Sequence, residues 1–163
     1  MSPLPRYRRW QIAAMEKNML NIEHIVTTIS DPAIFDRRDG GDGWTISEVL
    51  GHLADTDSYF LARAQALAAG EEPPAGSGMS VDERVKDAGY AEQDASALLQ
   101  RWLGVSAAYH EFLASLPDDD EELWERPGRD ADGGGFTLND QLILSAFHDL
   151  DHLHQIVKII RGI

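Results

Sequence analysis

Apolar residues recur at three- and four-residue steps through four long segments, and this spacing constrains the fold more than any other feature of the sequence. An α-helix turns once every 3.6 residues, so positions with this spacing form one stripe along a helix. The segments cover about residues 7–29, 46–69, 92–116 and 137–160. In the first of them, the repeated positions are Ile12, Met15, Met19, Ile22, Val26 and Ile29. Because we find no convincing strand pattern, the sequence predicts an all-α four-helix bundle.

The ends of these segments carry helix signals. Thr45 and Glu48 have the spacing of a capping box, in which each side chain bonds the backbone amide of the other residue. Thr137 and Asp140 repeat the arrangement in a weaker form at the start of the last segment. Gly70 follows the second segment, where a glycine commonly ends a helix. These signals predict helices that begin after Thr45 and after Thr137.

The connections between the segments differ in length. Residues 71–89 contain Pro73-Pro74 and Gly76-Ser77-Gly78, with one short helical turn expected near residues 81–86. A connection this long permits a crossover after the second helix, so the topology need not be simple up-and-down. Residues 118–135 form a second connection, which is acidic and rich in glycine. With 163 residues in all, the chain is predicted to be a single domain over residues 1–163.

The composition restricts the partners. The chain has 14 lysines and arginines against 28 aspartates and glutamates, so its formal net charge is −14. Such a charge repels phosphate backbones and anionic lipids, which argues against nucleic-acid and membrane partners. Cysteine is absent, which excludes disulfides and zinc–thiolate sites. We see no signal peptide and no membrane span of about 20 apolar residues, so a cytoplasmic protein is expected.

Three histidines form the candidate site. His148 and His152 are four residues apart in the last helix, which places both imidazoles on one face, within reach of one metal ion. His52 lies two turns after Thr45, and its apolar neighbours predict that it points into the bundle. The neighbours Leu144 and Phe147 predict the same for His148. The spacing therefore predicts a three-histidine metal site, with open coordination positions for a small molecule.

Nearby polar residues have several interpretations. Asp55, one turn after His52, could be a fourth ligand, could orient an imidazole, or could lie on the surface. Asp151 and Gln155, each about one turn from a histidine of the last helix, are candidates to support the ligands from outside the first coordination sphere. The run from His148 to His152 is only faintly similar to the HExxH motif of metalloproteases, because an aspartate replaces the glutamate. The remaining histidines, His24, His110 and His154, are expected to be surface or structural residues.

Two stretches of the chain resemble the DinB-like (YfiT-like) superfamily of metal-binding bundles. Residues 44–55 (WTISEVLGHLAD) resemble its W-[ST]-x-x-E-[IVL]-L-x-H-[LM] motif, and His148-x-x-x-His152-x-x-Gln155-Ile156 is similar to its C-terminal motif. The resemblance implies an up-down-down-up bundle, often a homodimer. It also implies a divalent metal, usually zinc or nickel, at His52, His148 and His152. Some relatives are transferases or isomerases that use a low-molecular-weight thiol as co-substrate.

Three functions are consistent with these features. The first is a metal-dependent enzyme that acts on a small molecule, as a thiol S-transferase or a hydrolase. The alternative is a non-catalytic metal-binding module with a structural or interaction role. The third is a bundle whose histidines bind nothing. No sequence feature selects the substrate.

Overall fold

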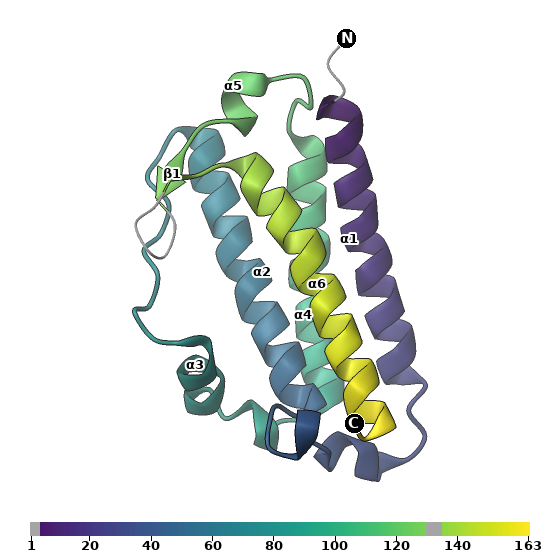
Figure 1. The fold of residues 1–163 in the computed structure, drawn as a ribbon. Coiled ribbons are helices and arrows are strands. Elements are labelled where there is room, and N and C mark those ends of the chain that lie inside the picture. The colour runs from purple at the N-terminus through teal and green to yellow at the C-terminus, as the bar shows by residue number, and fades with distance from the viewer. Residues whose placement is uncertain (1–3, 130–134) are drawn as a thin grey trace.

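Four long helices form the body of the molecule (Figure 1). The structure is a computed structural model that describes residues 4–129 and 135–163. The long helices are α1 (Leu4–Thr27), α2 (Ile46–Ala69), α4 (Ala95–Ser115) and α6 (Leu138–Arg161). The predicted all-α bundle is confirmed, with small shifts of the ends. For example, α4 begins three residues later than expected, because the side chain of Asp94 caps it by accepting from the amide of Ala97.

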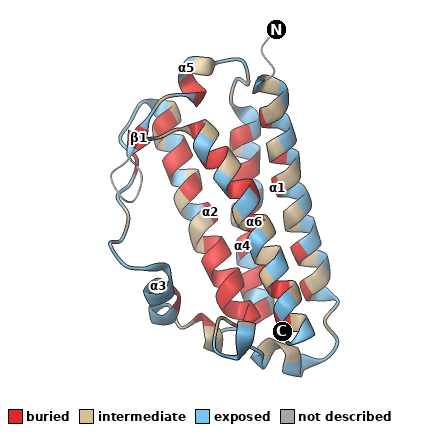
Figure 2. Ribbon diagram, in the orientation of Figure 1, coloured by how far each residue is buried: buried red, intermediate tan, exposed pale blue. Residues whose placement is uncertain are grey.

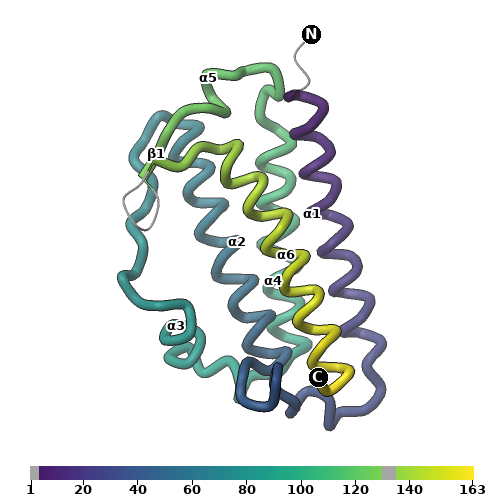
Figure 3. Tube along the Cα trace, in the orientation of Figure 1, coloured from purple at the N-terminus to yellow at the C-terminus, as the bar shows by residue number. Residues whose placement is uncertain are grey.

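The chain crosses over between α2 and α4, so these two helices run parallel to each other and antiparallel to α1 and α6 (Figures 1 and 3). The connection passes back along the bundle through α3 (Val81–Asp87) and the short 3-10 helix η3 (Tyr90–Glu92). The ring of Tyr90 lies so close to Gly51 of α2 that a β-carbon there would be 2.4 Å from it. Glycine at position 51 therefore lets the crossover pack against α2.

The predicted caps are present. Thr45 and Glu48 bond each other's backbone amides at 3.2 and 2.8 Å, and Thr137 and Asp140 do the same at 3.1 and 2.9 Å. Gly70 ends α2 with a φ of 74°, in the left-handed region that favours glycine. These local interactions fix where α2 and α6 begin, and with that the faces that carry their histidines.

The two connections at the ends of the bundle contain short elements that the periodicity did not predict. Between α1 and α2 lie two 3-10 helices, η1 (Pro32–Asp36) and η2 (Asp39–Gly41). The acidic connection contains α5 (Glu121–Trp124) and the strands β1 (Gly128–Arg129) and β2 (Gly135–Phe136), which pair antiparallel. Residues 130–134 of this connection lie outside the described residues. Two-residue strands are too short to produce an alternating pattern in the sequence.

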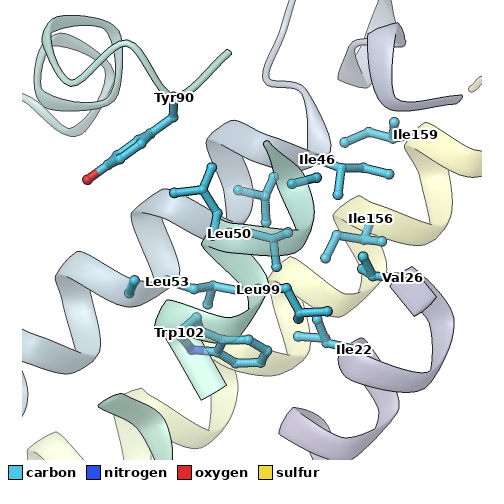
Figure 4. Close-up of a cluster of buried hydrophobic side chains, with 14 of the residues drawn as sticks. Ile22, Val26, Ile46, Leu50, Leu53, Tyr90, Leu99, Trp102, Ile156 and Ile159 are labelled. Carbon is cyan, nitrogen blue, oxygen red and sulfur yellow. The ribbon is translucent and has the colours of Figure 1, made fainter. Parts of the chain in front are cut away.

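The buried hydrophobic residues form two clusters along the bundle. Figure 2 marks the buried positions of the ribbon in red. One includes Leu50, Leu99, Trp102 and Ile156, shown in Figure 4, and the other is built around Phe60, Tyr109, Trp124 and Leu142. Within the described residues, no helix is long and apolar enough to cross a membrane.

The expectation that Leu144 and Phe147 lie on the inward face of α6 was wrong. They are 44% and 60% exposed. The buried stripe of α6 instead follows Leu142, Ala146 and Asp149. His148 therefore lies at the edge of this stripe, where a side chain can reach both a neighbouring helix and a cavity.

Candidate metal centre

The three predicted histidines come together between α2 and α6. The Nε2 atom of His148 lies 2.9 Å from Nε2 of His52 and 3.1 Å from Nε2 of His152. One candidate ligand atom from each residue lies within 4.8 Å of the others, an arrangement that could hold a metal ion. His148 and His152 are one turn apart on α6, and α2 runs antiparallel beside that helix. The positions of the three histidines along their helices therefore bring their imidazoles together.

A chain of hydrogen bonds determines which nitrogen of His152 carries a proton. Lys158 donates to Asp39 at 2.8 Å, and the amide nitrogen of Gln155 donates to the other oxygen of Asp39 at 3.1 Å. The amide oxygen of Gln155 therefore faces Nδ1 of His152 at 2.8 Å, and it can only accept. Nδ1 must carry the proton, so Nε2 of His152 presents a lone pair to the cluster.

A buried carboxyl group lies near the other nitrogen of His148. Its Nδ1 lies 3.9 Å from Oδ1 of Asp149, a residue that is fully buried, and this distance is too long for a hydrogen bond. A negative charge on this side favours a proton on Nδ1, but it does not fix the tautomer of His148 in the way that Gln155 fixes that of His152. With the proton on Nδ1, the Nε2 lone pairs of His148 and His152 face each other at 3.1 Å and repel unless a cation lies between them. Two imidazoles bound to a tetrahedral zinc at ~2.0–2.1 Å have nitrogens about 3.3 Å apart, so the cluster fits a metal with only a small adjustment.

Burial keeps the three histidines neutral. It lowers the pKa of His52 to about 2 and that of His152 to about 4, and it also lowers the pKa of His148. The neighbouring imidazoles contribute to the shifts at His52 and His152, and the charge of Arg84 adds to that at His52. Neutral imidazole is the form that binds a metal, so the cluster is ready to do so at neutral pH.

Trp44 forms a wall of the cluster, a role that the sequence did not indicate. Its ring lies 5.0 Å from the ring of His52 and stacks on His152 with 6.0 Å between centroids. Its Nε1 donates to Asp82 of α3 at 3.0 Å, which ties the crossover to the cluster. The sequence signal available was an aromatic residue directly before the cap of the helix that carries His52.

Of the three polar residues proposed to support the ligands, the structure places one in contact with the cluster. Gln155 contacts His152, as described above. Asp55 instead accepts from the hydroxyl of Tyr90 and from Arg101, both at 2.6 Å, and it does not join the three-histidine group. Asp151 is exposed. Among the other histidines, His24 and His154 are exposed, and His110 is buried against Ser106 of its own helix.

Two buried carboxylates beside the cluster were not predicted. Asp57 accepts from Nε1 of Trp102 at 2.9 Å, whereas neither oxygen of Asp149 has a hydrogen-bond partner among the described residues. Burial raises the pKa of each carboxyl to about 7, and the negative charge of Asp149 contributes at Asp57. Asp57 and Asp149 follow Leu53 and Ala146 at helical spacing, and this position on the buried stripes was the available signal.

A cavity of about 530 Å³ opens beside the cluster and is lined in part by His52 and His148. Its other walls come from α2 and from the crossover, including Phe60, Ser77 and Arg84. The volume is in the range of small-molecule sites. A ligand in this cavity would lie directly against two of the three imidazoles.

Comparisons with known proteins agree with this architecture. No curated protein matches the sequence. Among solved structures, YfiT from Bacillus subtilis, described as a probable metal-dependent hydrolase with an unusual four-helix bundle topology, has a TM-score of 0.82 at 21% identity. The match covers 99% of this chain and 89% of YfiT. A mycothiol-dependent maleylpyruvate isomerase has a TM-score of 0.75 at 16% identity, over 95% of this chain and 67% of the isomerase.

At these identities the two structures establish the fold alone. The family follows from the sequence: the DinB superfamily matches residues 14–156, which is most of the chain. The chain therefore belongs to the DinB superfamily.

Proposed function

We propose that this protein is a metal-dependent enzyme that acts on a small molecule, with His52, His148 and His152 as the metal ligands. The observation that carries the proposal is the convergence of three imidazole nitrogens, one of which, Nε2 of His152, has the ring proton held on the opposite side by Gln155. Imidazole ligands suit zinc and nickel, which are the metals we expect. Three protein ligands leave coordination positions open, as in catalytic sites.

The surrounding residues have distinct roles in this proposal. Gln155 holds His152 in the tautomer that a metal requires, and a negative charge on nearby Asp149 favours the same tautomer of His148. Trp44 covers one side of the cluster and limits the access of water, and the cavity on the other side admits the substrate. A divalent metal held there would lower the pKa of a water or a thiol bound to it, and so supply a nucleophile near neutral pH.

The two structural neighbours support hydrolysis and thiol-dependent chemistry as the reactions to test. YfiT is described as a probable metal-dependent hydrolase, and the isomerase depends on the thiol mycothiol. The present chain has no cysteine, so any thiol would enter as a free co-substrate. The homodimer suggested by the family resemblance stays a prediction, to be tested by the mass of the protein in solution.

Metal content is the first test. We expect about one zinc or nickel ion per chain in the wild type, and its loss in both His52→Ala and His148→Ala. His24→Ala is the matched control, because His24 is exposed and is not a member of the three-histidine group. A wild type that binds neither metal after both have been supplied would disprove the ligand assignment.

A second measurement separates an enzyme from a structural metal site. With cobalt in place of zinc, the visible spectrum reports the coordination sphere. A change of this spectrum on addition of a small thiol or azide indicates an exchangeable position and supports the enzyme. A spectrum that no added ligand changes, together with a large loss of stability on chelation, would favour the non-catalytic alternative.

A further inference from the structure

The cavity beside the histidine cluster has walls of different chemistry. Most of its surface is apolar and comes from Phe60, Ala75, Val81 and Val85, with Tyr59 at one side. The other polar lining residues are His52, Asp55 and Thr56 on α2, His148 on α6, and Ser77 and Arg84 on the crossover. A ligand that fills this cavity therefore needs an apolar body and a polar group that reaches the crossover wall.

Arg84 is a cation without a carboxylate partner. None of the ion pairs within residues 4–129 and 135–163 includes it, although the chain has twice as many acidic as basic residues. Within the part of the chain that the structure describes, the one hydrogen bond of its side chain goes to a neutral group, the hydroxyl oxygen of Ser77, at 3.2 Å. An arginine has five N–H donors, so most of the hydrogen-bonding capacity of Arg84 is available to a ligand.

Three acidic residues that adjoin Arg84 in the sequence or share the cavity with it have other hydrogen-bond partners. Asp82 accepts from Trp44, and Glu83 accepts from the amide and the hydroxyl of Ser80. Asp55, which also lines the cavity, is held by Arg101 and Tyr90. These carboxylates therefore do not neutralise Arg84.

Ser77 can supply a further donor next to Arg84. Its oxygen accepts from Arg84 and from the backbone amide of Met79 at 3.3 Å. Because the oxygen is the acceptor in both bonds, the hydroxyl hydrogen can be donated to a third group. A guanidinium and a hydroxyl side by side match the two oxygens of a carboxylate.

We propose that this cavity binds a small carboxylate with an apolar body, with the carboxylate on Arg84 and Ser77 and the body along Phe60 and Val85. The inference rests on the proposed function, since it assigns a substrate class to the same site. It makes Arg84 a specificity-determining residue, and it places the anionic end of the ligand on the crossover. The rest of the ligand then extends toward the histidines.

A pair of matched probes tests this assignment. Phenylacetate and phenylacetamide have the same shape and differ in charge. Their binding to the protein is measured by NMR titration, first after the removal of metal and then with zinc. In the metal-free protein we expect the acid to bind about tenfold more tightly than the amide, the lower end of the range for hydrogen bonds to a charged group. This preference should be lost in Arg84→Gln and partly retained in Arg84→Lys.

The control is Lys86→Gln, which removes the same charge from the same short helix. Lys86 is exposed and does not line this cavity, so the variant should keep the preference for the acid. Equal binding of the acid and the amide by the wild type, an acid preference that survives in Arg84→Gln, or binding of neither probe would overturn the proposal. Circular dichroism verifies that each variant is folded.

The outcomes for the metal and for Arg84 can be distinguished. Zinc is measured in the same samples, and Arg84→Gln should retain it. A wild type without zinc that still prefers the acid would contradict the proposed function and leave the carboxylate site standing. A wild type that binds zinc but shows no preference for the acid in its metal-free form would contradict the carboxylate site and leave the proposed function standing.

Discussion

Two groups of buried polar residues lie inside the bundle, and they differ in how their hydrogen-bond donors and acceptors are paired. In the network around Arg63, donors meet acceptors. Arg63 donates to Gln141 at 2.9 Å and to the carbonyls of Gly128 and Phe136. Gln141 donates in turn to the carbonyl of Phe60 and to the hydroxyl of Tyr109, at 2.8 and 2.9 Å. In the histidine cluster, by contrast, three ring nitrogens face one another, and Nε2 of His152 has no proton to donate.

The difference indicates which group serves the fold and which serves a ligand. The Arg63 network ties α2 to α6 and to both short strands through donors and acceptors of the chain itself. The histidine cluster brings three ring nitrogens together beside a cavity, an arrangement that could hold a cation. Buried nitrogens that converge beside a cavity are therefore better indicators of a site than buried polar groups as such.

The largest effect is expected when the Arg63 network is broken. Arg63→Met keeps much of the apolar stem but removes the donors, so that Gln141 and two backbone carbonyls lose a buried partner. Each such loss costs ~1–3 kcal/mol, so we expect the free energy of unfolding to fall by about 3–5 kcal/mol. Urea denaturation measures it. Zinc per folded chain should not change, and a stable variant without zinc would contradict the separation of the two groups.

Two glutamines on α6 allow the two groups to be tested separately, because Gln155 contacts the histidine cluster and Gln141 contacts Arg63. Gln155→Leu removes the acceptor for Nδ1 of His152, and we expect the metal affinity to fall about 10–100-fold with little change in metal-free stability. Gln141→Leu removes three buried hydrogen bonds, and we expect the stability to fall by about 3 kcal/mol with no change in metal affinity. Competition with a chelator and urea denaturation give the two quantities. Equal effects of both variants on either quantity would refute the distinction.

The dependence of stability on pH provides a third test, which asks whether His52 is held neutral in the folded protein. The pKa of His52 is about 2 in the folded protein, against 6.5 ordinarily, so below pH 6.5 the unfolded chain takes up a proton that the folded chain does not. Stability is therefore lost as the pH falls from 6.5, by up to about 1.4 kcal/mol per pH unit for this one group. Because the unfolded chain is only half protonated at pH 6.5, the metal-free wild type should lose about 1 kcal/mol more than His52→Gln between pH 6.5 and 5.5.

The buried carboxylates change stability in the opposite direction. Their pKa values are raised to about 7, so they favour the folded state as the pH falls from 7. For this reason the difference between the wild type and His52→Gln is the quantity to measure, rather than the wild-type slope. The exposed His24→Gln is the control and should follow the wild type. Parallel curves for the wild type and His52→Gln would show that His52 is not held neutral.

Local signals account for what the sequence could predict. The caps at Thr45 and Thr137 fix where α2 and α6 begin, and helix phase then places His52, His148 and His152 on inward faces. These inferences need only the residues within one helix, which is why the three histidines were found from the sequence.

What depends on packing between helices could not be predicted. Leu144 and Phe147 are exposed because the neighbours of α6 determine which side of it is buried. Asp149 and Trp44 could be linked to the site only once the elements were placed in space. Arg84 reaches the cavity through a crossover that has no periodic pattern, so its path could not be read from the sequence.

The smallest effect is expected at Asp55, which the sequence left as a ligand or a surface residue. Its ion pair with Arg101 is partly exposed on both sides, and such pairs contribute about 1 kcal/mol or less. Asp55→Asn should therefore retain the full metal content and lose less than about 1 kcal/mol of stability. If the metal were lost, Asp55 would have to leave Tyr90 and Arg101 to coordinate it. The metal would then need a fourth ligand that the structure holds elsewhere. The histidine cluster would differ even more from the Arg63 network, whose donors already meet acceptors within the chain.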